Sequence, residues 1–171
     1  MKLIIFSGLP GTGKSLLAEA VGRELGIPVF AKDWLEAVLL RSKLVPAETE
    51  KQLGSIGYDL LTVLAERQSS LGQSVILDSV ASTVSIRTTW RELARKYNAD
   101  WRVIECICSD LGIHRERLEK RQRRILGWHE LAWSDVEFVR SYYAPWDEKR
   151  LILDSIRSVD KNFLAALKYC K

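Results

Sequence analysis

The chain has 171 residues, 47% of them hydrophobic, and its 26 basic and 22 acidic side chains give a net charge of +4. This length suits a single domain (residues 1–171) with a substantial core, and no linker, repeat or low-complexity tract divides it. The first apolar run is too short for a membrane span or a signal peptide. Three cysteines without a second Cys-x-Cys pair exclude a disulfide framework and disfavour a zinc site. We therefore expect a cytoplasmic protein with buried thiols.

The positive charge is concentrated in one segment. Residues 114–125 contain six of the 26 basic and two of the 22 acidic side chains, which leaves 20 of each sign in the rest of the chain. Proteins that follow a nucleic-acid backbone usually spread their basic residues over a whole face. This compact cluster therefore favours an arginine clamp on a polyphosphate over a nucleic-acid groove.

The apolar periodicity predicts strands that alternate with helices. The expected strands cover residues 2–7, 27–30, 74–78, 101–108 and 150–154. The expected helices cover about 13–25, 33–42, 47–71, 86–97, 111–125, 134–144 and 160–169. The last but one should begin with a capping box formed by Ser134 and Glu137. This alternation predicts an α/β fold, with a parallel sheet covered by helices on both faces.

Polar residues follow several of these strands. The segment from Gly8 to Ser15, Asp33, Asp78 and Asp110 each come after a predicted strand. Ligands of open α/β sheets collect at the carboxyl ends of the strands. We therefore expect these residues to lie at one edge of the sheet.

A phosphate-binding loop is predicted at residues 8–15, whose sequence is Gly-Leu-Pro-Gly-Thr-Gly-Lys-Ser. Its glycines allow the backbone N–H groups to approach phosphate oxygens, and the helix that follows directs its positive dipole end at the same anion. A glycine-rich turn with a chance lysine is the alternative, but the strand before the loop and the helix after it are the context that the motif requires. We assign the phosphates of ATP to Gly8, Pro10, Gly11, Thr12, Gly13, Lys14, Ser15 and Leu16.

Two carboxylates are candidates for the chemistry. Asp78 ends an apolar strand, where it could hold Mg²⁺ together with the Ser15 hydroxyl; the alternative is a strand-ending Asp that caps backbone N–H groups. Asp33 opens a helix, where it could act as an N-cap, accept the proton of a substrate hydroxyl, or do both. We expect Asp78 to serve the metal and Asp33 the acceptor.

Three arginines of the basic segment, Arg117, Arg121 and Arg124, are spaced to share one helix face. A solvated face is the alternative, but the local charge excess favours an arginine lid on phosphate, with a mobile segment at about 109–133. His114 and His129 belong to no catalytic constellation, and we interpret both as non-catalytic. Trp90 and Trp101 suit the core, whereas Trp34 suits the core or a substrate pocket equally well.

The chain resembles the small P-loop kinases, a group that includes zeta-toxin-like, chloramphenicol-phosphotransferase-like, gluconate, shikimate and polynucleotide kinases. The resemblance is carried by the loop at 8–15, Lys32-Asp33-Trp34, Val75-Ile76-Leu77-Asp78, Arg117-Leu118-Glu119-Lys120-Arg121 and Ser134-Asp135. It implies a P-loop NTPase fold of three α/β/α layers, the sheet order 2-3-1-4-5 and a helical lid. It also implies Lys14, Asp33, Arg117 and Arg121 as catalytic residues, with Arg117 contacting the nucleotide as well.

The resemblance implies transfer of the ATP γ-phosphate to a hydroxyl of a small molecule or of a polynucleotide end, with Mg²⁺. Adenylate-type nucleotide kinases tend to have Asp-Gly after the third strand, whereas this chain has Asp78-Ser79, which disfavours a nucleoside monophosphate as the acceptor. The alternative is a P-loop NTPase that acts as a conformational switch or a regulatory ATP-binding protein. It is weakened because the chain has no Asp-x-x-Gly after the third strand and no Asn-Lys-x-Asp.

Overall fold

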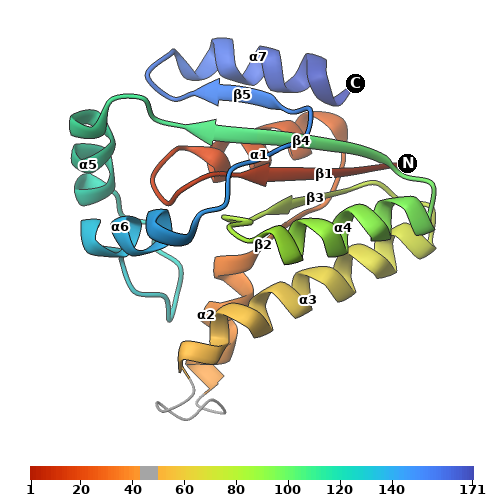
Figure 1. Cartoon of the computed structure of the whole chain (residues 1–171), viewed down its shortest axis with the longest axis horizontal. Helices are drawn as coiled ribbons and strands as arrows, with labels where there is room; N and C mark the ends of the chain where they lie inside the picture. Colours follow the sequence, from red (N-terminus) through yellow and green to blue (C-terminus); the bar gives the residue numbers. More distant parts are fainter. Residues whose placement is uncertain (43–49) are drawn as a thin grey trace.

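A single parallel sheet forms the centre of the protein. The structure is a computed structural model, and it describes the backbone of residues 1–42 and 50–171. The strands are β1 (Lys2–Ser7), β2 (Val29–Ala31), β3 (Val75–Asp78), β4 (Asp100–Ile107) and β5 (Leu151–Asp154). All four neighbouring pairs are parallel, in the order β2-β3-β1-β4-β5. The expected strand order is therefore confirmed (Figure 1).

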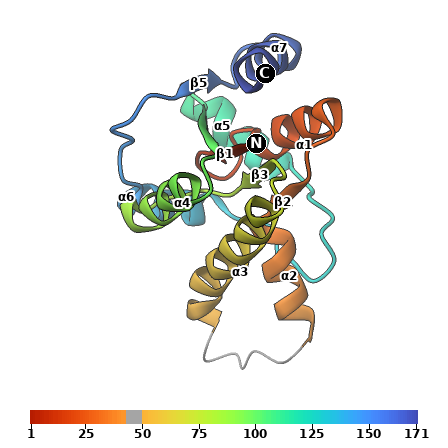
Figure 2. The same cartoon turned by 90° about the vertical axis from the view of Figure 1, so that its right-hand side faces the viewer.

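Helices cover both faces of the sheet, as Figure 2 shows. They are α1 (Lys14–Leu25), α2 (Lys32–Ser42), α3 (Glu50–Ser70), α4 (Val84–Lys96), α5 (Leu111–Lys120), α6 (Trp133–Tyr142) and α7 (Val159–Cys170). Alternate residues of β1 point to opposite faces, so that Leu3 and Ile5 pack with α3 and α4 while Ile4 and Phe6 pack with α1 and α7. The strands are apolar on both faces because both faces are buried, and the result is the expected three-layer arrangement.

The carboxyl ends of the strands face the segments expected to carry the chemistry. In Figure 1 the arrowheads of β1 and β4 point toward α5 and α6, and the paired ends of α2 and α3 project beyond the sheet. Within the described residues, no helix is both long enough and apolar enough to cross a membrane.

The basic segment is a shorter helix than its sequence predicted. Helix α5 ends at Lys120, because Arg121 is extended (φ −75°, ψ 136°) and Arg124 has a left-handed backbone with φ 53°. The prediction that Arg117, Arg121 and Arg124 share one helix face is therefore wrong. Two apolar residues of the segment, Leu118 and Ile125, are nevertheless 2% and 5% exposed. Both are therefore buried although the chain between Arg121 and Ile125 is not helical.

The start of α6 also differs from the prediction. The N-cap is Ala132, whose backbone N–H donates to Asp135 Oδ2 at 2.7 Å. The predicted capping box of Ser134 and Glu137 is thus wrong, and Glu137 instead accepts a hydrogen bond from Trp133 Nε1 at 2.9 Å. The other element boundaries agree closely, except that the predicted start of the long helix at Ala47 lies outside the described residues.

Candidate active site

The loop between β1 and α1 has the geometry of an anion cradle. Gly13, the N-cap of α1, has φ 83° and ψ 5°, and no side chain caps the helix. The first N–H groups of an uncapped helix are free to bind an anion, which the helix dipole also favours. No protein atom within the described residues would lie within 4 Å of a Cβ added at Gly13. The loop residues present therefore fit a bound phosphate.

The glycine at the start of the loop is required by the fold itself. A Cβ at Gly8 would lie 2.1 Å from the backbone oxygen of Cys106, at a φ of 137°. Glycine is thus required there by the close approach of the loop to β4. At Gly11, likewise, a Cβ would lie 3.1 Å from His114 Nε2. Close contacts with β4 and α5 therefore determine the backbone conformation of the loop.

Beside the loop, Lys14 and Asp78 are only 7% and 3% exposed. Burial raises the pKa of Asp78, and the nearby charge of Lys14 opposes that shift. Burial likewise lowers the pKa of Lys14, opposed by Asp78. Asp78 Oδ1 is buried and has no hydrogen-bond partner in the described part of the chain. A buried carboxylate oxygen without a partner, beside the Ser15 hydroxyl, fits Mg²⁺, which takes one or two protein oxygens and keeps several waters.

Cationic side chains surround the open side of the loop. A pocket of about 180 Å³ is lined by Gly11, Gly13, Lys14, Ser15, Leu16, Arg117, Arg121 and Arg123. The structure thus brings together Lys14, Arg117 and Arg121, as predicted. Arg124 lines none of the pockets described here and is exposed. Arg123, which the sequence reading did not single out, takes its place.

A second pocket, of about 480 Å³, lies on the outer side of the loop against the turn between β5 and α7. Its lining includes three exposed apolar side chains, Leu16, Ile156 and Val159. Arg117 connects this pocket to the cationic one, because it lines both and donates to the backbone oxygen of Ser155 at 2.7 Å. Apolar walls next to a phosphate cradle suit a nucleobase. Neither Ile156 nor Val159 could be found from the sequence, since nothing in it places this turn beside the loop.

A third pocket, of about 420 Å³, lies between the loop, α2, α3 and α6, and it contains Asp33. Asp33 is in the first turn of α2, where it forms an ion pair with Arg123. Arg123 Nη2 is also 3.5 Å from Ser15 Oγ. The acceptor candidate and the metal-binding candidate are therefore linked through one arginine. Lys14, Arg121 and Arg123 line both this pocket and the cationic one, so the two pockets adjoin.

The prominence of Arg123 has a simple geometric cause. The backbone around Arg121 is extended, and side chains two residues apart lie on the same side of an extended chain. Arg121 and Arg123 therefore face the loop together. The helical period on which the prediction depends pairs residues three or four apart instead.

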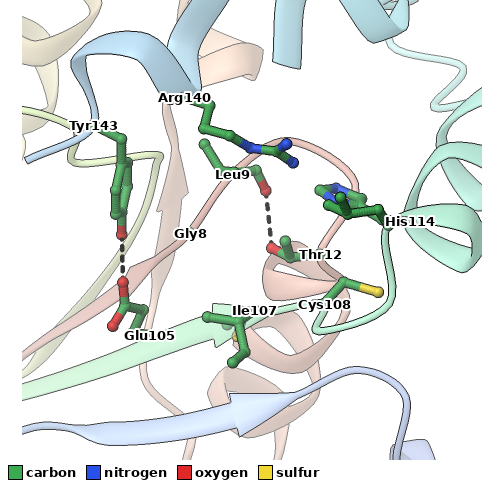
Figure 3. A pocket seen from close by; sticks show the side chains of 11 residues that line it. Gly8, Leu9, Thr12, Glu105, Ile107, Cys108, His114, Arg140 and Tyr143 are labelled. Atoms are coloured by element: carbon green, nitrogen blue, oxygen red, sulfur yellow. Dashed lines mark hydrogen bonds between the residues drawn. The ribbon is translucent and has the colours of Figure 1, made fainter. Parts of the chain in front are cut away.

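The histidines have structural positions. Figure 3 shows a further pocket, of about 370 Å³, behind the loop, where His114 lies beside Thr12 and Leu9 and opposite Glu105 and Tyr143. His114 is 1% exposed, and its Nε2 lies 2.7 Å from Pro10 O. Because a carbonyl only accepts, this nitrogen must carry the proton. His114 thus supports the loop. His129 stacks on Trp128, with 4.9 Å between the centres of the two rings.

The remaining expectations concern tryptophans and thiols. Trp90 is fully buried, whereas Trp101 is half-buried and donates to Glu148 at 2.8 Å. Trp34 is 52% exposed and lines none of the pockets described above. Cys106 and Cys170 are buried as expected, and Cys108 is half-buried.

The comparison with protein families now identifies the chain. A family model described as an AAA domain matches residues 3–130, from β1 through the loop to the end of the basic segment. The chain belongs to this AAA domain family. A search of curated proteins found no match.

Solved structures resemble this AAA domain protein over nearly its whole length. A candidate kinase from Chloroflexus aurantiacus J-10-fl has 23% identity and a TM-score of 0.77, with 99% of this chain and 98% of that chain covered. A gluconokinase from Sinorhizobium meliloti 1021 has 19% identity and a TM-score of 0.71, with 98% and 90% covered. The Mycobacterium tuberculosis APS kinase CysC, in complex with AMPPNP and APS, has 20% identity and a TM-score of 0.65, with 99% and 96% covered. The protein therefore has the P-loop fold of small kinases, and the resemblance stated from its motifs is confirmed.

Proposed function

We propose that the protein is an ATP-dependent kinase that transfers the γ-phosphate to a hydroxyl of a small molecule or a polynucleotide end. The observation that carries this proposal is the position of Asp33. Its carboxylate lines a separate pocket that adjoins the cationic pocket of the loop, and Arg123 joins the two. A protein that only binds or hydrolyses ATP has no need for a second pocket with a carboxylate in its lining.

On the nucleotide side, the proposal assigns the phosphates to residues 8–16 and the nucleobase to the pocket of Leu16, Ile156 and Val159. Lys14, Arg117 and Arg121 would neutralise phosphate charge, increasingly so as it develops in the transition state. Ser15 and Asp78 would hold Mg²⁺, which neutralises phosphate oxygens when bound. The fold of the kinases named above supports this assignment.

On the acceptor side, the proposal assigns the reacting hydroxyl to Asp33. Phosphoryl transfer requires the attacking oxygen to be held in line with the γ-phosphate, and a nearby carboxylate can orient it and take its proton. Asp33 is bound to Arg123 in this structure, so Arg123 must turn toward the phosphates before Asp33 can accept a proton. Arrival of the nucleotide would thus release the base.

We also propose that residues 109–133 form a lid. The segment lies on both the loop and α2, because Arg123 contacts Asp33, and Arg41 Nη1 lies 3.5 Å from Leu126 O. A lid must open to exchange ligands and close to exclude water. Hydrogen exchange should slow in this segment when a non-hydrolysable ATP analogue binds. Unchanged exchange there, with slower exchange elsewhere, would contradict the lid.

The kinase proposal is tested by measuring ATP consumption with a panel of hydroxyl compounds that includes 5′-hydroxyl oligonucleotides. The expected result is an ATPase rate that rises with one class of acceptor, with one phosphate ester formed per ATP consumed. Hydrolysis that ignores every acceptor, together with a nucleotide-dependent conformational change, would favour the switch instead.

A further inference from the structure

The charged side chains of the acceptor pocket are paired with each other or shared with the cationic pocket before any acceptor arrives. Its described lining contains two carboxylates, Asp33 and Glu36, and four cations, Lys14, Lys32, Arg121 and Arg123. Asp33 is paired with Arg123, and Glu36 is paired with Lys32. Lys14 and Arg121 also line the cationic pocket of the loop. Neither a carboxylate nor a cation of this described lining is left over for a charged acceptor.

The Lys32–Glu36 pair is built into the wall of the pocket. The two side chains are only 13% and 4% exposed, and Lys32 Nζ lies 4.8 Å from the centre of the Tyr58 ring. A Cβ added at Gly57 would lie 2.7 Å from Glu36 Oε1, so the carboxylate packs directly on α3. Separating such a pair would leave an uncompensated buried charge, which is strongly unfavourable. Lys32 is therefore not available to bind an anion.

The rest of the described wall is neutral. Hydroxyl groups come from two helices and the turn before α4: Tyr58 lies in α3, Tyr142 in α6, and Ser82 and Thr83 in the turn. Ser82 hydrogen-bonds to Tyr58 and Tyr142, and these bonds oppose the rise in tyrosine pKa that burial causes. Trp128 adds a third aromatic ring, which continues into an adjoining pocket of about 320 Å³ with Leu40 and Leu53. Hydroxyl groups and aromatic faces together suit a polyhydroxyl or ring-shaped molecule.

We infer that the acceptor is an uncharged hydroxyl compound, of the chemical class of neutral sugars and polyols. The inference rests on the proposed kinase function and narrows its acceptor. An anion entering this pocket would approach the carboxylates of Asp33 and Glu36. A cation would find Glu36 paired with Lys32 and Asp33 engaged by the reacting hydroxyl. Either ion would lose its hydration without gaining a partner.

Two acceptor classes are thereby excluded. A sugar acid needs a cation for its carboxylate, and the 5′-hydroxyl end of a polynucleotide needs cations for the phosphates that follow it. Among the described residues that line the acceptor pocket, Lys32 is the only cation that does not also line the cationic pocket, and it is occupied by Glu36.

The test uses a small-molecule extract of the protein's own cells, separated by ion exchange into uncharged, anionic and cationic fractions before any reaction. Each fraction is incubated with the enzyme and ATP labelled in the γ-phosphate, and a 5′-hydroxyl oligonucleotide is tested alongside. We expect labelled phosphate esters from the uncharged fraction only. Label transferred to the anionic or cationic fraction, or to the oligonucleotide, would overturn the inference. No label in any product, from protein that still binds ATP, would instead remove the kinase function on which it rests.

A variant tests whether the Lys32–Glu36 pair sets the selectivity. Glu36→Gln keeps the shape of the side chain and frees Lys32. The kcat/KM for acceptors that carry a carboxylate should therefore rise. We expect kcat/KM for a neutral acceptor divided by that for its carboxylate analogue to fall about tenfold or more. Glu66→Gln is the matched control, because Glu66 pairs with Lys96 on the surface of α3 and α4. An unchanged ratio in Glu36→Gln, or an equal fall in both variants, would overturn the role of the pair.

Discussion

The two halves of the site are held in different ways. On the nucleotide side, Lys14 and Asp78 are 7% and 3% exposed and belong to α1 and β3, which are part of the core. On the acceptor side, Asp33 and Arg123 have side chains that are 25% and 10% exposed, and Arg123 lies in a segment without regular structure. The nucleotide half is formed before ligand binds, whereas in the acceptor half the contact between Asp33 and the lid segment depends on one ion pair.

This difference suggests a division of labour. Preorganised charges stabilise a transition state well because they need no rearrangement during the reaction. An acceptor site that must admit and release a changing molecule benefits from contacts that can be exchanged. Substitutions on the nucleotide side should therefore affect chemistry most, and substitutions in the lid should have smaller effects.

The largest effect is expected at Lys14. Lys14→Ala should reduce kcat by about three to five orders of magnitude, the scale known for cations that stabilise the transferring phosphoryl group. Lys14→Met, which keeps the aliphatic stem, should lose as much, because the charge and not the packing is lost. Turnover and calorimetric titration with ATP–Mg²⁺ measure this. Equal affinity and turnover in wild type and variants would contradict the assignment of the loop at residues 8–15 to the phosphates of ATP.

Asp33 should come next. Asp33→Asn should lower turnover by about two to four orders of magnitude, the usual range for losing a general base. ATP affinity should remain near that of the wild type, because the residue lies in the acceptor pocket. Stability should fall by about 1 kcal/mol for the loss of an acidic residue in a helical first turn, and further because the largely buried Arg123 loses its ion-pair partner.

Asp59→Asn, on the exposed side of α3, is the control for Asp33. It should change neither turnover nor ATP affinity nor stability. Full turnover in Asp33→Asn would show that Asp33 only stabilises the start of α2 and has no catalytic role. A large loss of ATP binding would mean that Asp33 and Asp78 have exchanged roles.

Arg123 and Arg124 form a matched pair for the lid. Arg123→Gln should lower kcat/KM about ten- to a hundredfold. This loss is smaller than that expected for Lys14→Ala, because Arg121 remains beside Arg123. Arg124→Gln removes the same charge from an exposed residue and should stay within about twofold of the wild type. Steady-state kinetics of both variants measures this. Equal losses in the two variants would show that only net charge matters. A larger loss in Arg124→Gln would support the phosphate-binding role predicted for Arg124 from the sequence.

The smallest effect is a pH dependence of stability at His114. Burial lowers its pKa from the ordinary value of 6.5; the Pro10 carbonyl opposes this, and Arg140, Lys14 and Arg117 add to it. The unfolded chain therefore takes up a proton first as the pH falls. Stability from this residue is complete above about pH 6.5 and is lost below it, by at most about 1.4 kcal/mol per pH unit.

Urea denaturation at pH 7.5 and 5.5 measures this dependence. His114→Gln, which can still donate to Pro10, should lose less stability on acidification than the wild type. His129→Gln, at an exposed site, should behave like the wild type. An identical pH dependence in all three proteins would show that His114 is not held neutral by the fold.

The local sequence predicted the parts of the fold that depend on short-range rules. Apolar runs of strand length and helical periodicity were enough for the alternation of elements, and the spacing of Gly8, Lys14 and Ser15 was enough for the loop. The rule that ligands lie at the carboxyl ends of strands then brought Asp33 and Asp78 to the correct edge. The strand order came from the resemblance to small P-loop kinases, and it is confirmed.

The sequence alone therefore determined the loop, the layers and the edge at which the site lies, because each depends on residues close together in the chain. Only the tertiary structure decided the partners across the site. Arg123 meets Asp33 because the chain leaves the helix after Lys120 and is extended at Arg121. The pairing of Lys32 with Glu36 has the helical spacing of four, but only the packing of α2 on α3 buries it and so withdraws both charges from the acceptor. Such outcomes depend on contacts between distant segments, which no local pattern encodes.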